Sequence, residues 1–148
     1  MFDIPREIFL PGIEENPNFR KSFEMTQLLL DEFKKISDKN DFETIFLFVP
    51  LREQIDQTYQ DAFKQDFFSD TSKILIDQPQ NILLEQTTKE NVSFIDLSKV
   101  MRKENTNNSF YFNVDGHWNE DGHKFVADYV FKVLSEKKMI RYGKELNS

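Results

Sequence analysis

The sequence predicts an α/β fold in which a mostly parallel sheet lies between two layers of helices. Residues 45–49 are five consecutive apolar residues without polar alternation, a pattern typical of a strand buried on both faces of a parallel sheet. A second strand pattern, residues 92–97, follows an intervening helical stretch. Because strands that alternate with helices favour parallel pairing through crossover connections, we expect a three-layer α/β/α sandwich.

The N-terminal part of the chain predicts an arm followed by a long helix. Prolines and a glycine interrupt residues 1–15, which we interpret as an arm. It would pack through three apolar residues, Ile8, Phe9 and Leu10. A helix is expected from Asn16 or Asn18, either of which can act as N-cap, to about Ile36. Six apolar residues near helical spacing form its expected core stripe: Phe19, Phe23, Leu29, Leu30, Phe33 and Ile36.

Four segments connect and follow the two strands. Residues 51–67 have helical composition, and residues 73–76 fit either a short strand or a loop that packs its apolar side chains. Residues 81–89 predict another helix, and residues 98–103 a helical turn after the second strand.

The C-terminal part predicts a polar loop, a short extended stretch and a last helix. Residues 105–109 are polar and lead to an extended stretch at residues 110–112. Asn119 is the expected N-cap of the last helix, where Glu120 and Asp121 would favour the positive end of the helix dipole. Six residues form the expected buried face of this helix: Phe125, Val126, Tyr129, Val130, Val133 and Leu134.

Composition limits the classes of function. A chain of 148 residues fits one domain with one core, and its 39% hydrophobic content describes a globular protein. It has no cysteine, which excludes disulfides, thiol nucleophiles and cysteine-based zinc sites. A net charge of −7 opposes binding to nucleic acids and to anionic membranes. The sequence contains no signal-peptide pattern and no membrane segment, and it does not indicate a localisation.

Asp115 and His117 are the candidate catalytic residues. They lie in a loop between an extended stretch and an Asn-capped helix, which would place an imidazole at the sheet edge where ligands of α/β folds collect. In a triad, His117 would take a proton from a nucleophilic hydroxyl, and Asp115 would orient the ring and stabilise the imidazolium. Loss of such an aspartate costs about 10⁴ in rate, so both residues should matter.

Residues 115–123, Asp-Gly-His-Trp-Asn-Glu-Asp-Gly-His, are followed by Ala127 in the last helix. This block resembles the C-terminal signature of the SGNH/GDSL hydrolases. Residues 46–54 resemble a central strand of that family and residues 94–97 a later one, so the resemblance spans about residues 43–135. The Asp-x-His spacing resembles the branch of polysaccharide O-acetyltransferase-like and acyl-esterase proteins.

The resemblance implies an SGNH-hydrolase or flavodoxin-like sandwich with Asp115 as triad acid and His117 as triad base, and no metal or organic cofactor. The family's Gly-Asp-Ser nucleophile motif and its oxyanion-hole glycine and asparagine have no counterpart here. The only glycines are Gly12, Gly116, Gly122 and Gly143, and no serine stands in such a turn. We therefore expect a domain that is incomplete at its N-terminus, that lacks the first strand with the nucleophile, and that is inactive by itself.

The parent activity implied by the resemblance is serine ester hydrolysis or acyl transfer on a carbohydrate or lipid ester, through an acyl-enzyme. Full-length relatives are often extracytoplasmic. A second hypothesis is a non-catalytic remnant or protein-binding module that pairs through an exposed sheet edge, because a sheet of only these strands would have an open edge. The partner would be a second copy or another chain that completes the sheet, and activity could return in that complex.

Several of these side chains also fit other roles. Asp115, His117 and His123 include metal-ligand types, but His123 falls one turn into the helix, and we expect no metal site. A structural role for His117 is the alternative to the triad. Trp118 fits packing better than sugar stacking. Arg52 could bind a carboxylate or a carbohydrate, although pairing with a neighbouring acid is favoured.

Overall fold

A computed structural model describes residues 6–105 and 110–140 of the chain. The chain divides into two compact units, residues 1–104 and residues 105–148. The first unit contains a two-stranded parallel sheet and most of the helices, and the second contains a hairpin and the last helix. The predicted α/β class is confirmed by this combination of helices with a parallel sheet.

The arm and the first helix form largely as expected. Two 3-10 helices, η1 (Arg6–Phe9) and η2 (Ile13–Glu15), precede the long helix α1 (Pro17–Lys39). Asn16 is the N-cap, because its side chain accepts the backbone N–H of Asn18 at 3.0 Å. The arm packs through Phe9, which is fully buried and meets the ring of Phe63 edge to face.

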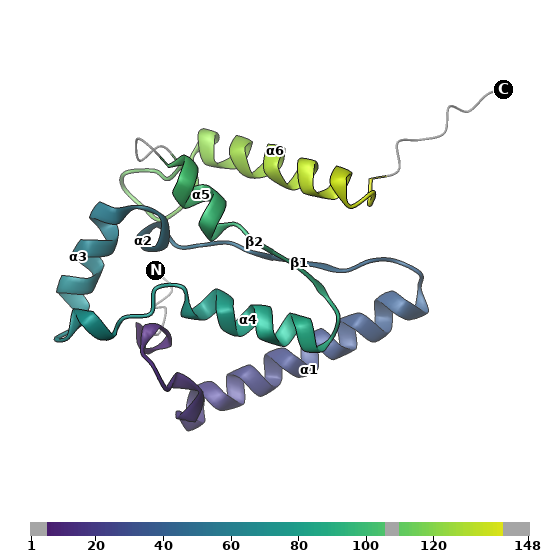
Figure 1. The fold of residues 1–148 in the computed structure, drawn as a ribbon, viewed down its shortest axis with the longest axis horizontal. Coiled ribbons are helices and arrows are strands. Elements are labelled where there is room, and N and C mark those ends of the chain that lie inside the picture. The colour runs from purple at the N-terminus through teal and green to yellow at the C-terminus, as the bar shows by residue number, and fades with distance from the viewer. Residues whose placement is uncertain (1–5, 106–109, 141–148) are drawn as a thin grey trace. The chain divides into compact units, whose positions relative to one another are not determined.

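The sheet consists of β1 (Ile45–Phe48) and β2 (Ser93–Asp96), which pair in parallel with Ile45 opposite Ser93. Helix α4 (Gln78–Lys89) leads into β2 and lies along it, with α1 beside α4 (Figure 1). Side-chain hydrogen bonds from both helices join them. Gln27 donates to the Glu90 carboxylate at 2.6 Å, and Gln86 donates to the Phe23 carbonyl at 2.9 Å.

The connection between the strands adds detail to the prediction and moves the start of one helix. The helical character predicted for residues 51–67 is confirmed, and it is divided between two separate helices, α2 (Arg52–Ile55) and α3 (Gln57–Phe67). Asp56 is extended between them and caps α3, since its carboxylate accepts two backbone N–H groups. Residues 73–76 are not a strand, and η3 (Thr71–Lys73) opens the loop there. Helix α4 begins earlier than predicted, with a proline in its first turn.

A buried amide network holds α2 against the chain that precedes α4. The Gln54 side chain donates to the Ile76 carbonyl and to the Gln80 side chain, each at 2.9 Å. Its oxygen accepts the backbone N–H of Leu51, also at 2.9 Å. Helix α5 (Ser98–Glu104) joins this network through Arg102, whose guanidinium donates to the Gln54 carbonyl and to the Asp77 carboxylate.

The expected burial of β1 and of the α1 stripe is wrong in part. All four β1 residues are half-buried, because β1 has a hydrogen-bonded neighbour on one side only among the described residues. On α1, Leu30 is 2% exposed whereas Leu29 is 55% exposed. The stripe predicted from spacing is therefore wider than the buried face of α1. The residues left exposed, here called the α1 apolar stripe, are Met25, Leu28, Leu29, Phe33 and Ile36.

The second unit begins with a hairpin and ends with α6 (Glu120–Glu136). Tyr111 and Trp118 form an antiparallel bridge across the hairpin, in place of the simple extended stretch expected at residues 110–112. Asn119 caps α6 as predicted, since its side chain accepts the Gly122 N–H at 3.0 Å. Most of the predicted polar loop, residues 106–109, lies outside the described residues.

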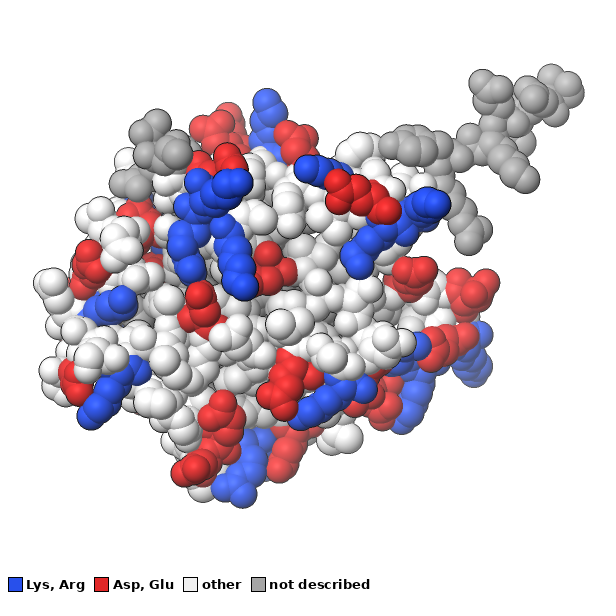
Figure 2. Space-filling model, viewed as in Figure 1, with Lys and Arg blue, Asp and Glu red and all other residues white. Residues whose placement is uncertain are grey.

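The visible face of the molecule carries charges of both signs. Figure 2 shows basic and acidic side chains interspersed on the visible face. Among the described residues, no helix combines the length and the apolar character that crossing a bilayer requires.

Candidate active site

Residues 110–119 form the hairpin that carries both predicted catalytic residues. The backbone N–H of Phe112 donates to the His117 carbonyl at 3.0 Å, and the N–H of Asn119 donates to the Phe110 carbonyl at 3.0 Å. These bonds tie the two ends of the hairpin together on either side of its turn. The turn is therefore held at its base by backbone bonds that do not depend on which side chains it presents.

Asp115 and His117 meet at the tip of this hairpin. The Asp115 carboxylate oxygen Oδ1 accepts the backbone N–H of His117 at 2.9 Å and lies 3.3 Å from Nδ1 of its imidazole. The backbone bond spans two residues, a local turn that aspartate side chains form readily. The structure thus brings together the two residues that the sequence singled out.

The bond from the His117 backbone lowers the pKa of Asp115, and contact with the imidazole adds to this effect, although some desolvation acts in the opposite direction. The carboxylate form of Asp115 is therefore favoured, because hydrogen bonds donated to an ionised acid stabilise it. An anionic partner at Nδ1 is what a general-base histidine requires.

The imidazole of His117 is open to approach. Its side chain is 85% exposed, and that of Asp115 is 46% exposed. With Nδ1 facing the carboxylate, Nε2 lies on the opposite side of the ring and is the nitrogen available to a reacting hydroxyl. The pair can hold and release a proton at Nε2.

The neighbours of the pair are packing residues. Trp118 is half-buried, and its ring meets the His123 imidazole edge to face, with centroids 5.6 Å apart. This contact agrees with the packing role that was favoured for Trp118. Within residues 6–105 and 110–140, no three histidine, aspartate or glutamate side chains gather closely enough to hold a metal ion.

Gly122 is a site residue that the sequence analysis missed. A Cβ at this position would lie 2.3 Å from the Phe110 carbonyl oxygen and 3.1 Å from Cβ of Trp118. Only glycine allows the first turn of α6 to approach the hairpin so closely. The signal was present, because an isolated glycine lowers the stability of a helix and such a cost indicates a packing role.

Arg52 pairs with a neighbouring acid, as was favoured. Its Nε lies 3.9 Å from Oδ2 of Asp56, and its guanidinium stacks 3.4 Å above the centroid of the Tyr59 ring. Arg52 and Asp56 are both buried within the first unit. Arg52 therefore stabilises the α2–α3 corner and is not presented to solvent as an anion-binding group.

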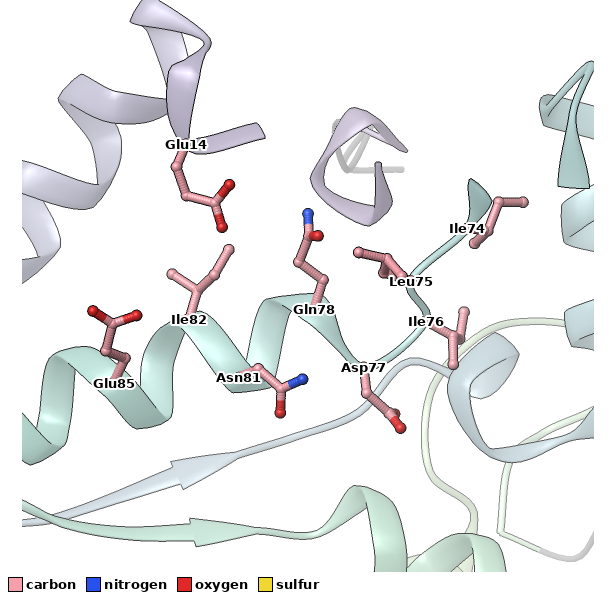
Figure 3. A pocket seen from close by; sticks show the side chains of 9 residues that line it. All are labelled: Glu14, Ile74, Leu75, Ile76, Asp77, Gln78, Asn81, Ile82 and Glu85. Carbon is pink, nitrogen blue, oxygen red and sulfur yellow. The ribbon is translucent and has the colours of Figure 1, made fainter. Parts of the chain in front are cut away.

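A hollow of about 510 Å³ lies in the first unit, between the arm and the start of α4 (Figure 3). Its polar lining is acidic and amide in character, and two of its groups already have partners. Asp77 binds Arg102, and Gln78 donates to the carbonyls of Ile8 and Leu10, at 2.7 Å each. Glu14 and Ile82 point toward each other across it. Gln78 joins the arm to α4, whereas Asp77 joins the start of α4 to α5.

The comparisons with known proteins give one match. A protein-family model described as "SGNH hydrolase-like domain, acetyltransferase AlgX" matches residues 12–146, which is nearly the whole chain. No curated protein and no solved structure matches the chain significantly. The family match includes the hairpin, the Asp115–His117 pair and both strands.

Proposed function

Since the chain belongs to the SGNH hydrolase-like domain family of the acetyltransferase AlgX type, we propose that it supplies the acid and base of an acyl-transfer site. Asp115 is the triad acid and His117 the triad base. The reaction is hydrolysis or transfer of an acyl group on a carbohydrate or lipid ester, through a serine acyl-enzyme. The nucleophilic serine and the oxyanion-hole donors come from a polypeptide segment other than residues 1–148.

The observation that carries this proposal is the paired geometry of Asp115 and His117. An ionised carboxylate 3.3 Å from Nδ1 favours the tautomer that leaves a lone pair on Nε2. When a serine hydroxyl attacks an ester carbonyl, its proton passes to Nε2, and Asp115 stabilises the imidazolium that forms. The same proton is returned to the leaving alkoxide as the acyl-enzyme forms.

Two of the described serines do not fit the role of the nucleophile. In the second unit, the described serine is Ser135, near the end of α6, and its hydroxyl donates to the Phe131 carbonyl at 2.8 Å. In the first unit, Ser98 is fully buried and donates to the Asp96 carboxylate at 2.6 Å. Neither hydroxyl has the exposed strand-to-helix position that a nucleophile requires.

Reassembly with a serine tests the proposal. The 148-residue chain would be mixed with a separately produced segment of an AlgX-type domain that carries the serine motif, and aryl acetate hydrolysis would be measured. We expect hydrolysis only in the mixture, and we expect it to be lost with His117→Ala. A mixture that hydrolyses the ester equally well with His117→Ala would refute the role of His117.

A second candidate function is a binding module that pairs through the β1 edge. It is favoured by the half-exposed β1 residues and by the α1 apolar stripe, because exposed apolar patches of several hundred Å² commonly mark interaction sites. Sedimentation across a range of concentrations separates the two functions. Association that disappears with Val49→Lys, with no activity in any mixture, would favour the binding module over the acyl-transfer site.

A further inference from the structure

The side chain of Asn119 forms hydrogen bonds with both the start of α6 and the catalytic hairpin. Its Oδ1 accepts the Gly122 N–H at 3.0 Å, and its Nδ2 donates to the Tyr111 carbonyl at 3.3 Å. Its backbone N–H donates to the Phe110 carbonyl at 3.0 Å. Asn119 therefore bonds the first turn of the helix and the opposite arm of the hairpin at the same time.

Gly122 makes this arrangement possible. The Phe110 carbonyl that accepts the Asn119 N–H also faces the Cα of Gly122, where a Cβ would be only 2.3 Å from its oxygen. Any larger residue would push α6 away from the hairpin and would stretch the bonds of Asn119. The helix cap formed by Asn119 and the close approach of α6 to the hairpin at Gly122 therefore depend on each other.

We propose that Asn119 and Gly122 position the Asp115–His117 pair. They act through the hairpin, because Asn119 fixes the strand arm that follows His117 while the Phe112 N–H fixes the His117 carbonyl. The inference rests on the proposed function of the pair, but its geometric content is independent of any nucleophile. Asn119 and Gly122 touch neither substrate nor the reacting atoms, and they are positioning residues.

Asn119→Ser separates positioning from helix capping. Serine is also a good N-cap, so α6 keeps an acceptor for its first turn, but its short hydroxyl cannot bridge to the Tyr111 carbonyl. Gly122→Ala disturbs the same contact between α6 and the hairpin, but from the helix side. Gly116→Ala is the matched control, because a Cβ there meets nothing within 4 Å although the residue stands between Asp115 and His117.

Two measurements on the full 148-residue chain report on the geometry of the hairpin tip. Carbon-detected NMR titration would give the pKa of Asp115, and hydrogen exchange would give the protection of the His117 N–H. With Asn119→Ser, we expect the Asp115 pKa to rise toward its ordinary value. The His117 N–H should exchange roughly two- to tenfold faster, the change produced by loss of one ordinary hydrogen bond. Gly116→Ala should leave both readouts unchanged.

Unchanged readouts with Asn119→Ser would overturn the proposal and would leave Asn119 as a helix cap only. If the second unit of Gly122→Ala stays folded, the Asp115 pKa and the His117 N–H exchange rate should shift in the same direction as in Asn119→Ser. If that variant unfolds, the result for Asn119→Ser alone tests the proposal. Because neither readout involves catalysis, failure here is distinct from failure of the proposed function, which the reassembly assay with His117→Ala tests.

Discussion

Oδ1 of Asp115 accepts the backbone N–H of His117 at 2.9 Å and lies 3.3 Å from Nδ1 of the same histidine. One oxygen atom therefore both forms the turn and orients the imidazole. The backbone bond needs only an acceptor, whereas stabilisation of an imidazolium needs a negative charge. The two roles of Asp115 can be separated by substitution.

Asp115→Asn should keep the turn and remove the charge. The carboxamide oxygen still accepts the His117 N–H, but the amide no longer favours the tautomer that a general base needs. In the reassembled domain, we expect kcat for aryl acetate hydrolysis to fall by about 10⁴, as for the corresponding change in serine proteases. Asp128→Asn, at an exposed position on α6, is the control and should leave kcat unchanged. Equal rates for the wild type and Asp115→Asn would remove Asp115 from the triad.

The stability of the turn formed by Asp115 and His117 should fall in acidic solution. Because the folded pKa of Asp115 is lowered, the stabilisation from its hydrogen bond is fully present above the unfolded pKa of about 3.9. It is lost as pH falls through the lower, folded value. We therefore expect the protection factor of the His117 N–H to persist to pH 4 and to decline only in more acidic solution. In Asp115→Asn it should be independent of pH over this range, and a wild-type decline centred above pH 4 would contradict the geometry.

Adjacent leucines on α1 test the packing of the first unit. Leu30 is 2% exposed and Leu29 is 55% exposed, so the same substitution should have different effects. Leu30→Ala should lower the free energy of unfolding by about 2–5 kcal/mol, through lost burial and a residual cavity. Leu29→Ala should change it by no more than about 0.5 kcal/mol. Urea unfolding of both variants at low protein concentration measures the difference, and equal destabilisation would show that the α1 apolar stripe is covered.

Local chemistry made several parts of the fold predictable. The apolar run of β1 and the second strand were read correctly, because such runs need no knowledge of distant residues. The N-caps Asn16 and Asn119 were likewise recognisable, since capping joins residues only a few positions apart. The Asp115–His117 pair was predictable for the same reason, because the two residues are separated by one glycine.

Features that depend on tertiary contacts were less predictable. The width of the α1 core stripe depends on tertiary contacts, and helical spacing widened the predicted stripe to Leu29, which is 55% exposed. The break between α2 and α3 depends on the Asp56 side chain competing for backbone N–H groups. The need for glycine at position 122 depends on the Phe110 carbonyl, twelve residues earlier in the chain.

We propose above that this chain holds the acid and base of an acyl-transfer site without its nucleophile. Treatment of the purified 148-residue chain with a serine-directed fluorophosphonate, followed by intact-mass measurement, tests it most directly. We expect no adduct, while a serine esterase treated in parallel is fully labelled. An adduct at a defined serine of residues 1–148, abolished by His117→Ala, would contradict the claim and would identify a complete triad.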